Sequence, residues 1–484
     1  MNNLLRFLAA MACFNLVQSA SAQELLTLED AIEFAKNNST EAQSAKTTYE
    51  NSTWTYKSYR ANLLPSMQFT GTIPSFNRSF VTNLQDDGTQ VFVPSNYVST
   101  LGNIRVNQNI GLTGGSVFLS TGLTQQINQN ANNPVSYLST PIRVGFQQDL
   151  FGFNNFKWQN ETQPLQFEKA KQQYLEQMEG VAISTVNLFF NYYDAQINVE
   201  LAKLNFANSD TLYKISKGRY QLGKIAEHDL LQMELNLLNS KKNYRQALID
   251  LENAEQELKN FIGIKSTGKL LLMVPNEIDT FSVQTDLAVQ KALNNRSDVL
   301  DMQQRMIGAD RELARAKSSA RPNVSLNASY GISGNEATLT DAYGNTLPQQ
   351  QFTTSVSVPI LNWGRGKADV KIAESNKELT QVQVDMQKLS FEQEIKNQVN
   401  QFNFRKQEYY IAAKSDTIGQ KRFEVAYKRY MIGKIDITDL NIAQQDKDQS
   451  KRNYLNTLRR YWIDYYRLRQ LTLYDFEQNA DIEF

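Results

Sequence analysis

Two spacings of apolar residues alternate along the chain. Between about residues 160 and 221, apolar side chains recur at heptad positions, from Tyr174 to Phe206. Sustained heptad spacing predicts a helix with a coiled-coil seam. At about 1.5 Å per residue, a helix of about 60 residues is roughly 90 Å long, more than a globular core accommodates. Residues 229–262 continue in the same style, so the chain is predicted to reverse at the turn over 222–228.

The second spacing is a strict alternation of apolar and polar residues in short runs. The runs are at 67–73, 104–112, 116–123, 142–150, 323–330 and 356–360. Such runs are typical of membrane barrel strands with a wet lumen, although a soluble sandwich has the same period. A tight turn is predicted at 113–115, whereas 74–102 and 127–140 are predicted to be long polar loops. Short turns on one side and long loops on the other favour an outer-membrane barrel.

Both patterns occur twice in the same order. RYQLGKIAEHDLLQ begins at Arg219 and RYMIGKIDITDLNI begins at Arg429, a shift of 210 residues. The N-terminal part of each copy aligns instead with a shift of 257 residues, which places Pro65 on Pro322. Because the two shifts differ by 47 residues, the sequence predicts a tandem duplication with an insertion in the first copy.

The duplication predicts the domain organisation. The first copy comprises a helix over 27–64, strands and loops over 65–152, a long helix over 160–221, the turn over 222–228, a helix over 229–262 and a linker over 263–284. The second copy comprises a helix over 285–321, strands over 322–362, a long helix over 367–431, a turn over 432–438, a helix over 439–470 and a tail over 471–484. Thr27 and Asp30 form a capping-box pattern at the start of the first helix, and a proline ends each N-terminal helix.

The first residues have the order of a secretory signal. Arg6 precedes an apolar stretch that is too short to span a bilayer, and Ala20-Ser21-Ala22 follows it. We therefore expect residues 1–22 to be a signal peptide. An alternative interpretation makes Cys13, the single cysteine, the acylated residue of a lipoprotein, although Ala10-Met11-Ala12 is a poor lead-in.

Composition excludes several functional classes. The 50 Lys and Arg residues balance 50 Asp and Glu residues, and no basic face interleaved with aromatics indicates nucleic-acid binding. HExxH, GxSxG and Cys/His patterns are absent, so we expect no enzyme activity, no cofactor and no metal site. GRGK at 364–367 lacks the rest of a phosphate-binding loop and is predicted to be a strand-to-helix transition.

At three places the sequence resembles the TolC family of outer-membrane efflux proteins. These are LTLEDAIEFAKNNS, VPILNWGRGKADV and the two RYxxGK...DL turns, and the resemblance covers essentially the whole mature chain. It implies an α+β membrane protein, a homotrimer whose outer-membrane β-barrel continues into a long periplasmic α-helical coiled-coil barrel. It also implies a passive exit duct of a Gram-negative bacterium, joined by a periplasmic adaptor (membrane fusion protein) to an inner-membrane pump.

The chain departs from the family pattern in its first strand region. Family members contribute four strands per subunit, whereas the insertion here supplies an additional hairpin at about 103–125. If both strands join the barrel, a trimer would have about 18 staves rather than about 12. The alternative is a hairpin that folds over the outer mouth. Intact apolar alternation favours joining the barrel.

The resemblance also implies roles at the two turns. Asp439, Asp229 and Tyr430 match the pore constriction, where threefold rings of carboxylates would favour cations. The adaptor-contacting surface is matched by Arg219, Leu222, Gly223, Arg429, Ile432 and Gly433. The plainer alternatives are helix caps for the aspartates and solvated helix-end charges for the arginines. His228, the single histidine, is predicted to be an exposed residue of the tip.

Two positions differ from the family's constriction. Ile435 stands where a basic partner of the tyrosine is usual, and Ile442 stands where a second acidic ring is usual. Lys434 and Asp436 are possible substitutes for the latch, the ionic contact that would hold the closed state together. We therefore expect the closed state of this chain to differ from the best-known arrangement.

Three competing functions remain at this stage. A periplasmic coiled-coil scaffold would be long and repetitive, but it would not need alternating strands. A general diffusion porin would not need such long stretches of coiled coil, and an exported enzyme would need a catalytic motif. The expected function is therefore an exit duct for drug or metabolite efflux or for type I protein secretion.

Overall fold

The computed structural model describes residues 24–129, 134–265, 268–274, 278 and 281–483. Within them the chain forms two compact units. We call residues 1–50, 170–297 and 389–484 the helical unit, and residues 51–169 and 298–388 the sheet unit. The predicted signal peptide, including Cys13, lies outside the described residues.

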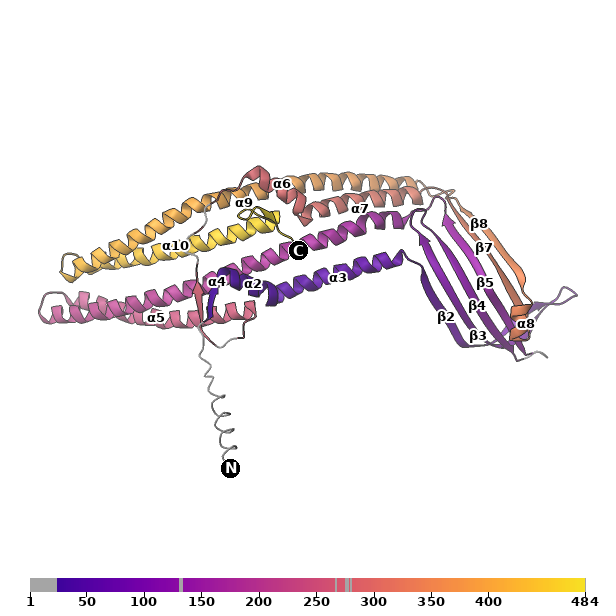
Figure 1. The fold of residues 1–484 in the computed structure, drawn as a ribbon, viewed down its shortest axis with the longest axis horizontal. Coiled ribbons are helices and arrows are strands. Elements are labelled where there is room, and N and C mark those ends of the chain that lie inside the picture. The colour runs from indigo at the N-terminus through magenta and orange to yellow at the C-terminus, as the bar shows by residue number, and fades with distance from the viewer. Residues whose placement is uncertain (1–23, 130–133, 266–267, 275–277, 279–280, 484) are drawn as a thin grey trace, which may run out of the picture. The chain divides into compact units, whose positions relative to one another are not determined.

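Long helices dominate the helical unit (Figure 1). The two longest, α4 (Asn155–Gln221) and α9 (Arg365–Met431), have 67 residues each and extend into it from the sheet unit. Each turns back into a 36-residue helix, α5 (Glu227–Ile262) and α10 (Ile437–Thr472). α9 begins and ends 210 residues after α4, and α10 begins and ends 210 residues after α5. This is the same shift that relates the two turn sequences.

The N-terminal helices are broken, and the prediction of one continuous helix over 27–64 and another over 285–321 was wrong. The structure has α2 (Leu28–Asn38) and α3 (Thr40–Asn62), then α6 (Thr285–Asn295) and α7 (Ser297–Ser319). The break residues Ser39 and Arg296 have extended backbone angles. Ser39 starts a new helix because its hydroxyl accepts a hydrogen bond from the Ala42 amide at 3.1 Å. The capping box of Thr27 and Asp30 is confirmed.

The helical unit also contains two small sheets that the sequence did not predict. β1 (Glu24–Thr27) pairs in parallel with β6 (Leu270–Met273), and β9 (Tyr474–Asp475) pairs antiparallel with β10 (Ala480–Asp481). The Tyr192 hydroxyl donates to the Leu270 carbonyl at 2.8 Å. Phe189 and Phe190 of the same helix are fully buried, and each buried side chain of this size stabilises the fold by about 1.5 to 3 kcal/mol.

The sheet unit contains one antiparallel sheet in the order β2-β3-β4-β5-β7-β8 (Figure 1). The strands are β2 (Ser66–Leu84), β3 (Gln90–Ile110), β4 (Gly115–Asn128), β5 (Val135–Asp149), β7 (Asn323–Glu336) and β8 (Leu347–Ser357). A short helix, α8 (Leu339–Gly344), links the last two. The predicted extra hairpin forms parts of β3 and β4, in the interior of this sheet.

The predicted long loops are mostly strand. β2 and β3 pair as far as Leu84 and Gln90, so 74–102 is not a loop. The register shifts between Thr72 and Ser75, and an extra residue in one strand moves the following apolar residues to the other parity. A similar shift between Ser139 and Ile142 interrupts the alternation in β5. Because of these irregularities, strict alternation of apolar and polar residues does not continue through β2 and β5, and the sequence pattern did not predict their full length.

None of the helices in the described part of the chain has a stretch long and apolar enough to cross a membrane.

Candidate functional site

The first long helix of each pair ends with the same hydrogen bonds. After α4, Gly223 donates to the Tyr220 carbonyl at 2.8 Å and Lys224 donates to the Arg219 carbonyl at 2.9 Å. After α9, the equivalent bonds of the second turn are both 2.9 Å long. This is a Schellman motif, whose glycine takes the left-handed conformation. Gly223 and Gly433 do so, with φ of +64° and +74°.

The returning helices start differently. At α5 the Asp229 carboxylate accepts from the Ala226 amide at 3.3 Å, so Asp229 acts as a cap. At α10 the cap is Asp436, whose carboxylate accepts from the Asp439 amide at 2.9 Å. The Asp439 side chain is exposed, and within the described residues its carboxylate accepts no hydrogen bond. Of the two predicted constriction aspartates, Asp229 is therefore engaged as a cap, whereas Asp439 is not engaged within the described residues.

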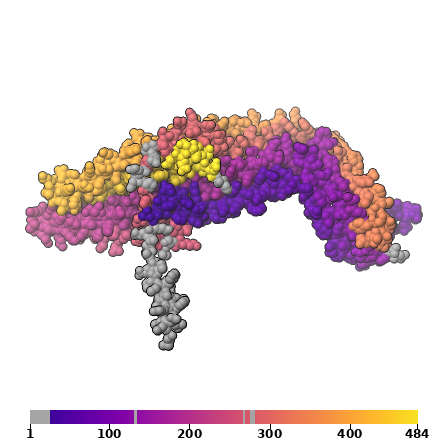
Figure 2. Space-filling view, viewed as in Figure 1, coloured from indigo at the N-terminus to yellow at the C-terminus, as the bar shows by residue number. Residues whose placement is uncertain are grey.

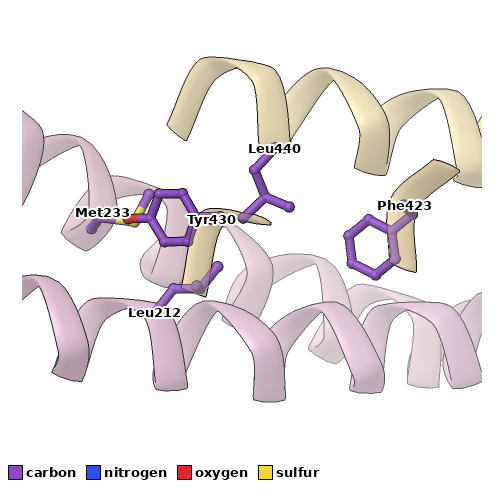
Figure 3. Close-up of a cluster of buried hydrophobic side chains, with 5 residues drawn as sticks. All are labelled: Leu212, Met233, Phe423, Tyr430 and Leu440. Carbon is purple, nitrogen blue, oxygen red and sulfur yellow. The ribbon is translucent and has the colours of Figure 1, made fainter. Parts of the chain in front are cut away.

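Tyr430 packs inside the helical unit. It is 7% exposed and lies in a buried cluster, shown in Figure 3, formed by Leu212, Met233, Phe423, Tyr430 and Leu440. Its hydroxyl lies 3.4 Å from the Ser216 hydroxyl. Tyr220, the corresponding residue of the first turn, is 40% exposed. The two turns thus share a backbone but not the environment of their tyrosines.

Arg219 connects the two turns. Its guanidinium donates to the Met431 carbonyl at 3.2 Å and lies 5.6 Å from the centre of the Tyr430 ring. Arg219 is therefore more than a solvated helix-end charge. Ile435, the residue in place of a basic latch, packs with Ile437 against the buried cluster. The second turn is held by apolar contacts where the resemblance implied an ionic one.

Leu222 and Ile432 project from the turns. Their side chains are 73% and 67% exposed, and each precedes the left-handed glycine. Arg429, Lys434 and His228 are also exposed.

A buried ionic cluster in the same unit was missed from the sequence. Glu179 of α4 accepts from Arg469 at 2.9 Å and from Lys36 at 2.7 Å, and Arg469 also pairs with Asp475. Burial opposes the charge of Arg469, but the Glu179 carboxylate and the Tyr465 hydroxyl raise its pKa above the usual value. The cluster joins α2, α4, α10 and the tail. No sequence signal identified it, because its members are far apart in the chain.

The large sheet has one apolar and one polar face. The register places Met67, Val106, Leu119, Val144 and Tyr330 side by side across five strands. Most of these side chains are exposed, as is Phe352 of β8 on the same face. The neighbouring row on the opposite face contains Gln68, Arg105, Ser120, Arg143, Gly331 and Gln349.

Among the described residues, no group of three or more His, Cys, Asp or Glu side chains is placed to hold a metal ion.

The comparisons with known proteins agree with this architecture. The family model for outer membrane efflux proteins matches residues 115–264 and 288–472. The toxin and drug export protein A of Aggregatibacter actinomycetemcomitans is 26% identical over 270 residues, which cover 53% of this chain and 53% of that protein. The chain spans about half the length of the curated relatives it matches.

Two solved channels share the fold. The CmeC outer membrane channel of Campylobacter jejuni has a TM-score of 0.65 at 17% identity, covering 92% of this chain and 85% of that one. The outer membrane protein VceC of Vibrio cholerae has a TM-score of 0.63 at 13% identity, covering 94% and 97%. With the family match extending over four strands of the sheet and both turns, the chain belongs to the outer membrane efflux protein family.

Proposed function

We propose that this chain is one subunit of an outer-membrane exit duct, which passively carries small molecules or proteins from a periplasmic adaptor and an inner-membrane pump to the exterior. The observation that carries the proposal is membership of the outer membrane efflux protein family, established over 115–264 and 288–472. The matched range includes both helix turns and four strands of the sheet.

Three copies would close the sheet into a barrel. In the described residues β2 pairs only with β3 and β8 pairs only with β7, so the sheet has two free edges. Both edge strands are exposed along their whole length or nearly so, and unpaired edges of this length invite pairing with another chain. Joining β8 of each copy to β2 of the next would give about 18 strands. The extra hairpin would belong to this barrel, and its position in the interior of the sheet supports this.

The two faces of the sheet fit a bilayer and a wet lumen. Exposed Phe69, Phe80 and Phe352 lie on the apolar face, which would contact outer-membrane lipid. The polar face would line the duct, as the alternation of membrane barrel strands requires. The periplasmic part would be the paired long helices.

The chain would have arisen by tandem duplication. The long helices of the two copies keep one constant offset, whereas α6 and α7 follow α2 and α3 at a larger one. These are the two shifts found in the sequence. The repeat explains why one subunit would contribute two turns to a common tip.

At that tip, Asp439 and Asp229 would form the constriction and Tyr430 would fix the helices that carry them. The exposed Leu222 and Ile432, with Gly223, Gly433, Arg219 and Arg429, would form the adaptor-contacting surface. Support comes from the exposure of the two apolar side chains and from the bond between Arg219 and the second turn. Lys434 is exposed, whereas the carboxylate of Asp436 already caps α10. Lys434 is therefore the better candidate for the latch of the closed state.

Membrane fractionation and gene deletion test the proposal together. The protein is expected in the outer-membrane fraction as a trimer whose electrophoretic migration changes on heating. Deleting the gene should raise susceptibility to some compounds or remove some secreted proteins. A soluble periplasmic product, or an unchanged compound profile and secretome, would contradict the exit-duct assignment.

A further inference from the structure

Two arginines share one row of the polar face of the sheet. Arg105 of β3 is opposite Ser120 of β4, which in turn is opposite Arg143 of β5. Residues directly opposite one another in neighbouring strands point to the same face. Since neighbouring strands lie about 4.8 Å apart, the two backbone positions are about 10 Å from each other. Both guanidinium groups therefore belong to one patch.

Arg105 is held in place by an aromatic ring. Its guanidinium carbon lies 3.8 Å from the centre of the Phe118 ring. The ring lies over Gly145, where a Cβ atom would come within 2.2 Å of it. The glycine thus makes room for the ring that supports the arginine. Stacking on a ring uses the flat face of a guanidinium and leaves its N–H edges available for an anion.

Arg143 is held by neutral acceptors. Its Nε and Nη2 atoms donate to the Ser329 hydroxyl at 3.2 and 2.9 Å, and Nη2 also donates to the Gln351 amide oxygen at 2.8 Å. These bonds orient the guanidinium without neutralising it. Within the described residues, neither Arg143 nor Arg105 forms a salt bridge.

Carboxylates are nearly absent from the strands of this sheet. Asp149 and Glu336 are the only two, and each is the last residue of its strand. By the register Glu336 lies on the apolar face. Asp149 is six residues from Arg143 along β5, which corresponds to about 20 Å. The middle of the polar face therefore has positive charge with no compensating negative charge.

We propose that Arg105 and Arg143 form an anion-binding site in the lumen of the duct, which selects cargo bearing carboxylate, sulfonate or phosphate groups. This inference rests on the proposed function, because only a closed barrel turns the polar face into a lumen. Three copies would place six guanidinium groups in one ring. The N–H edges of Arg105 match the paired oxygens of such anions, and Arg143 adds its charge and the N–H groups of Nη1, since its Nε and Nη2 donate to Ser329 and Gln351. Gln68, Ser120 and Gln349 in the same row add uncharged hydrogen-bonding groups.

The test measures ion selectivity and block in planar bilayers. Purified trimer is incorporated at low salt, because dissolved ions screen such charges. The reversal potential is measured in a KCl gradient, and benzene-1,3,5-tricarboxylate is added to either side as the blocking anion. Wild type is compared with the double variant R105Q/R143Q and with the matched control R78Q. Arg78 is an exposed arginine of β2 that the register places on the apolar face.

The tricarboxylate is expected to block wild type, and R105Q/R143Q should need at least tenfold more of it for half-maximal block. The reversal potential of the double variant should shift toward cation preference, while R78Q should behave as wild type. Unchanged block in R105Q/R143Q, or no block of a conducting wild-type trimer, would overturn the anion site and leave the exit duct standing. Failure of the wild-type protein to form a trimer or to conduct would overturn both.

Discussion

At the scale of single residues, Glu179 illustrates how strongly the helical unit depends on one carboxylate. The side chain is 1% exposed and accepts from Arg469 and Lys36. Glu179→Gln would leave both cations without their shared counter-charge, and removing one partner of a buried pair costs about 3 to 5 kcal/mol. We expect a clearly lower urea midpoint for unfolding of the helical unit, followed by circular dichroism. Glu234→Gln, an exposed position of α5, is the matched control, and equal midpoints for the two variants would contradict this role.

Sequence could not reveal Glu179, although it did identify the residues of the turns. The acid lies among many other charges of a long helix, and its partners are 143 and 290 residues away. Gly223 and Gly433 could be identified because the repeated RYxxGK pattern places a glycine directly after the end of each long helix. Tyr430 and Tyr220 stand at matching positions of the repeat, yet only Tyr430 is buried. Burial of that kind depends on how the four helices meet, which local patterns do not encode.

At the scale of elements, the left-handed glycines should decide the stability of the turns. An added Cβ at Gly223 or Gly433 would meet nothing within 4 Å, so the cost of alanine is the backbone strain of about 1 to 2 kcal/mol. Gly218→Ala is the control, because this glycine lies inside α4 with open space around it. There alanine should stabilise by about 1 kcal/mol through its helix propensity. Urea midpoints should therefore move in opposite directions, and a common direction would exclude backbone strain as the cause.

The ion pair that attaches the tail after α10 to the helical unit is expected to depend on pH. In Figure 2 the end of α10 and the tail, in yellow, lie on the surface of the helical unit. Lys291 donates to the Asp481 carboxylate at 2.9 and 3.0 Å, and with Asn295 it lowers the pKa of Asp481. Because the pKa of Asp481 is lower in the folded state, its ion pair with Lys291 stabilises the folded tail above the unfolded-state pKa of about 3.9. This stabilisation is lost as the pH falls through the folded-state pKa.

Hydrogen exchange of residues 474–482, corrected for intrinsic rates, is the measurement for the tail. Exchange at pH 3 or below should be faster than at pH 5 in wild type, and Asp481→Asn should remove most of that difference. An equal pH response in the variant would assign the effect to another group.

Element boundaries were predictable where one pattern ran unbroken. The heptads over 160–221 predicted the C-terminal end of α4, Gln221, because the glycine turn follows at once. The repeat predicted the corresponding end of α9, Met431. The breaks at Ser39 and Arg296 were missed, since a polar residue on an exposed helix face and a break residue look alike in sequence. The half of β2 beyond Thr72 was missed because the extra residue there reverses the parity of the apolar residues that follow in β2.

At the scale of the whole molecule, the proposed duct carries opposite charges on its two functional surfaces. The exposed, unbonded Asp439 would form a threefold acidic ring at the tip, whereas Arg105 and Arg143 would form a basic ring on the polar face of the sheet. Asp439→Asn should lower the cation preference measured as a reversal potential, and R105Q/R143Q should raise it, because each ring attracts ions of the opposite sign.

Asp436→Asn is the control for the first change. Asparagine is also a good N-cap, so this variant removes a carboxylate from the same turn without removing its cap. If Asp439→Asn and Asp436→Asn shifted the potential equally, general tip charge rather than a ring at Asp439 would set the selectivity. If neither did, the ion-selective constriction would lie away from this turn, and the apolar contacts of Ile435 and Tyr430 would be left to close the tip.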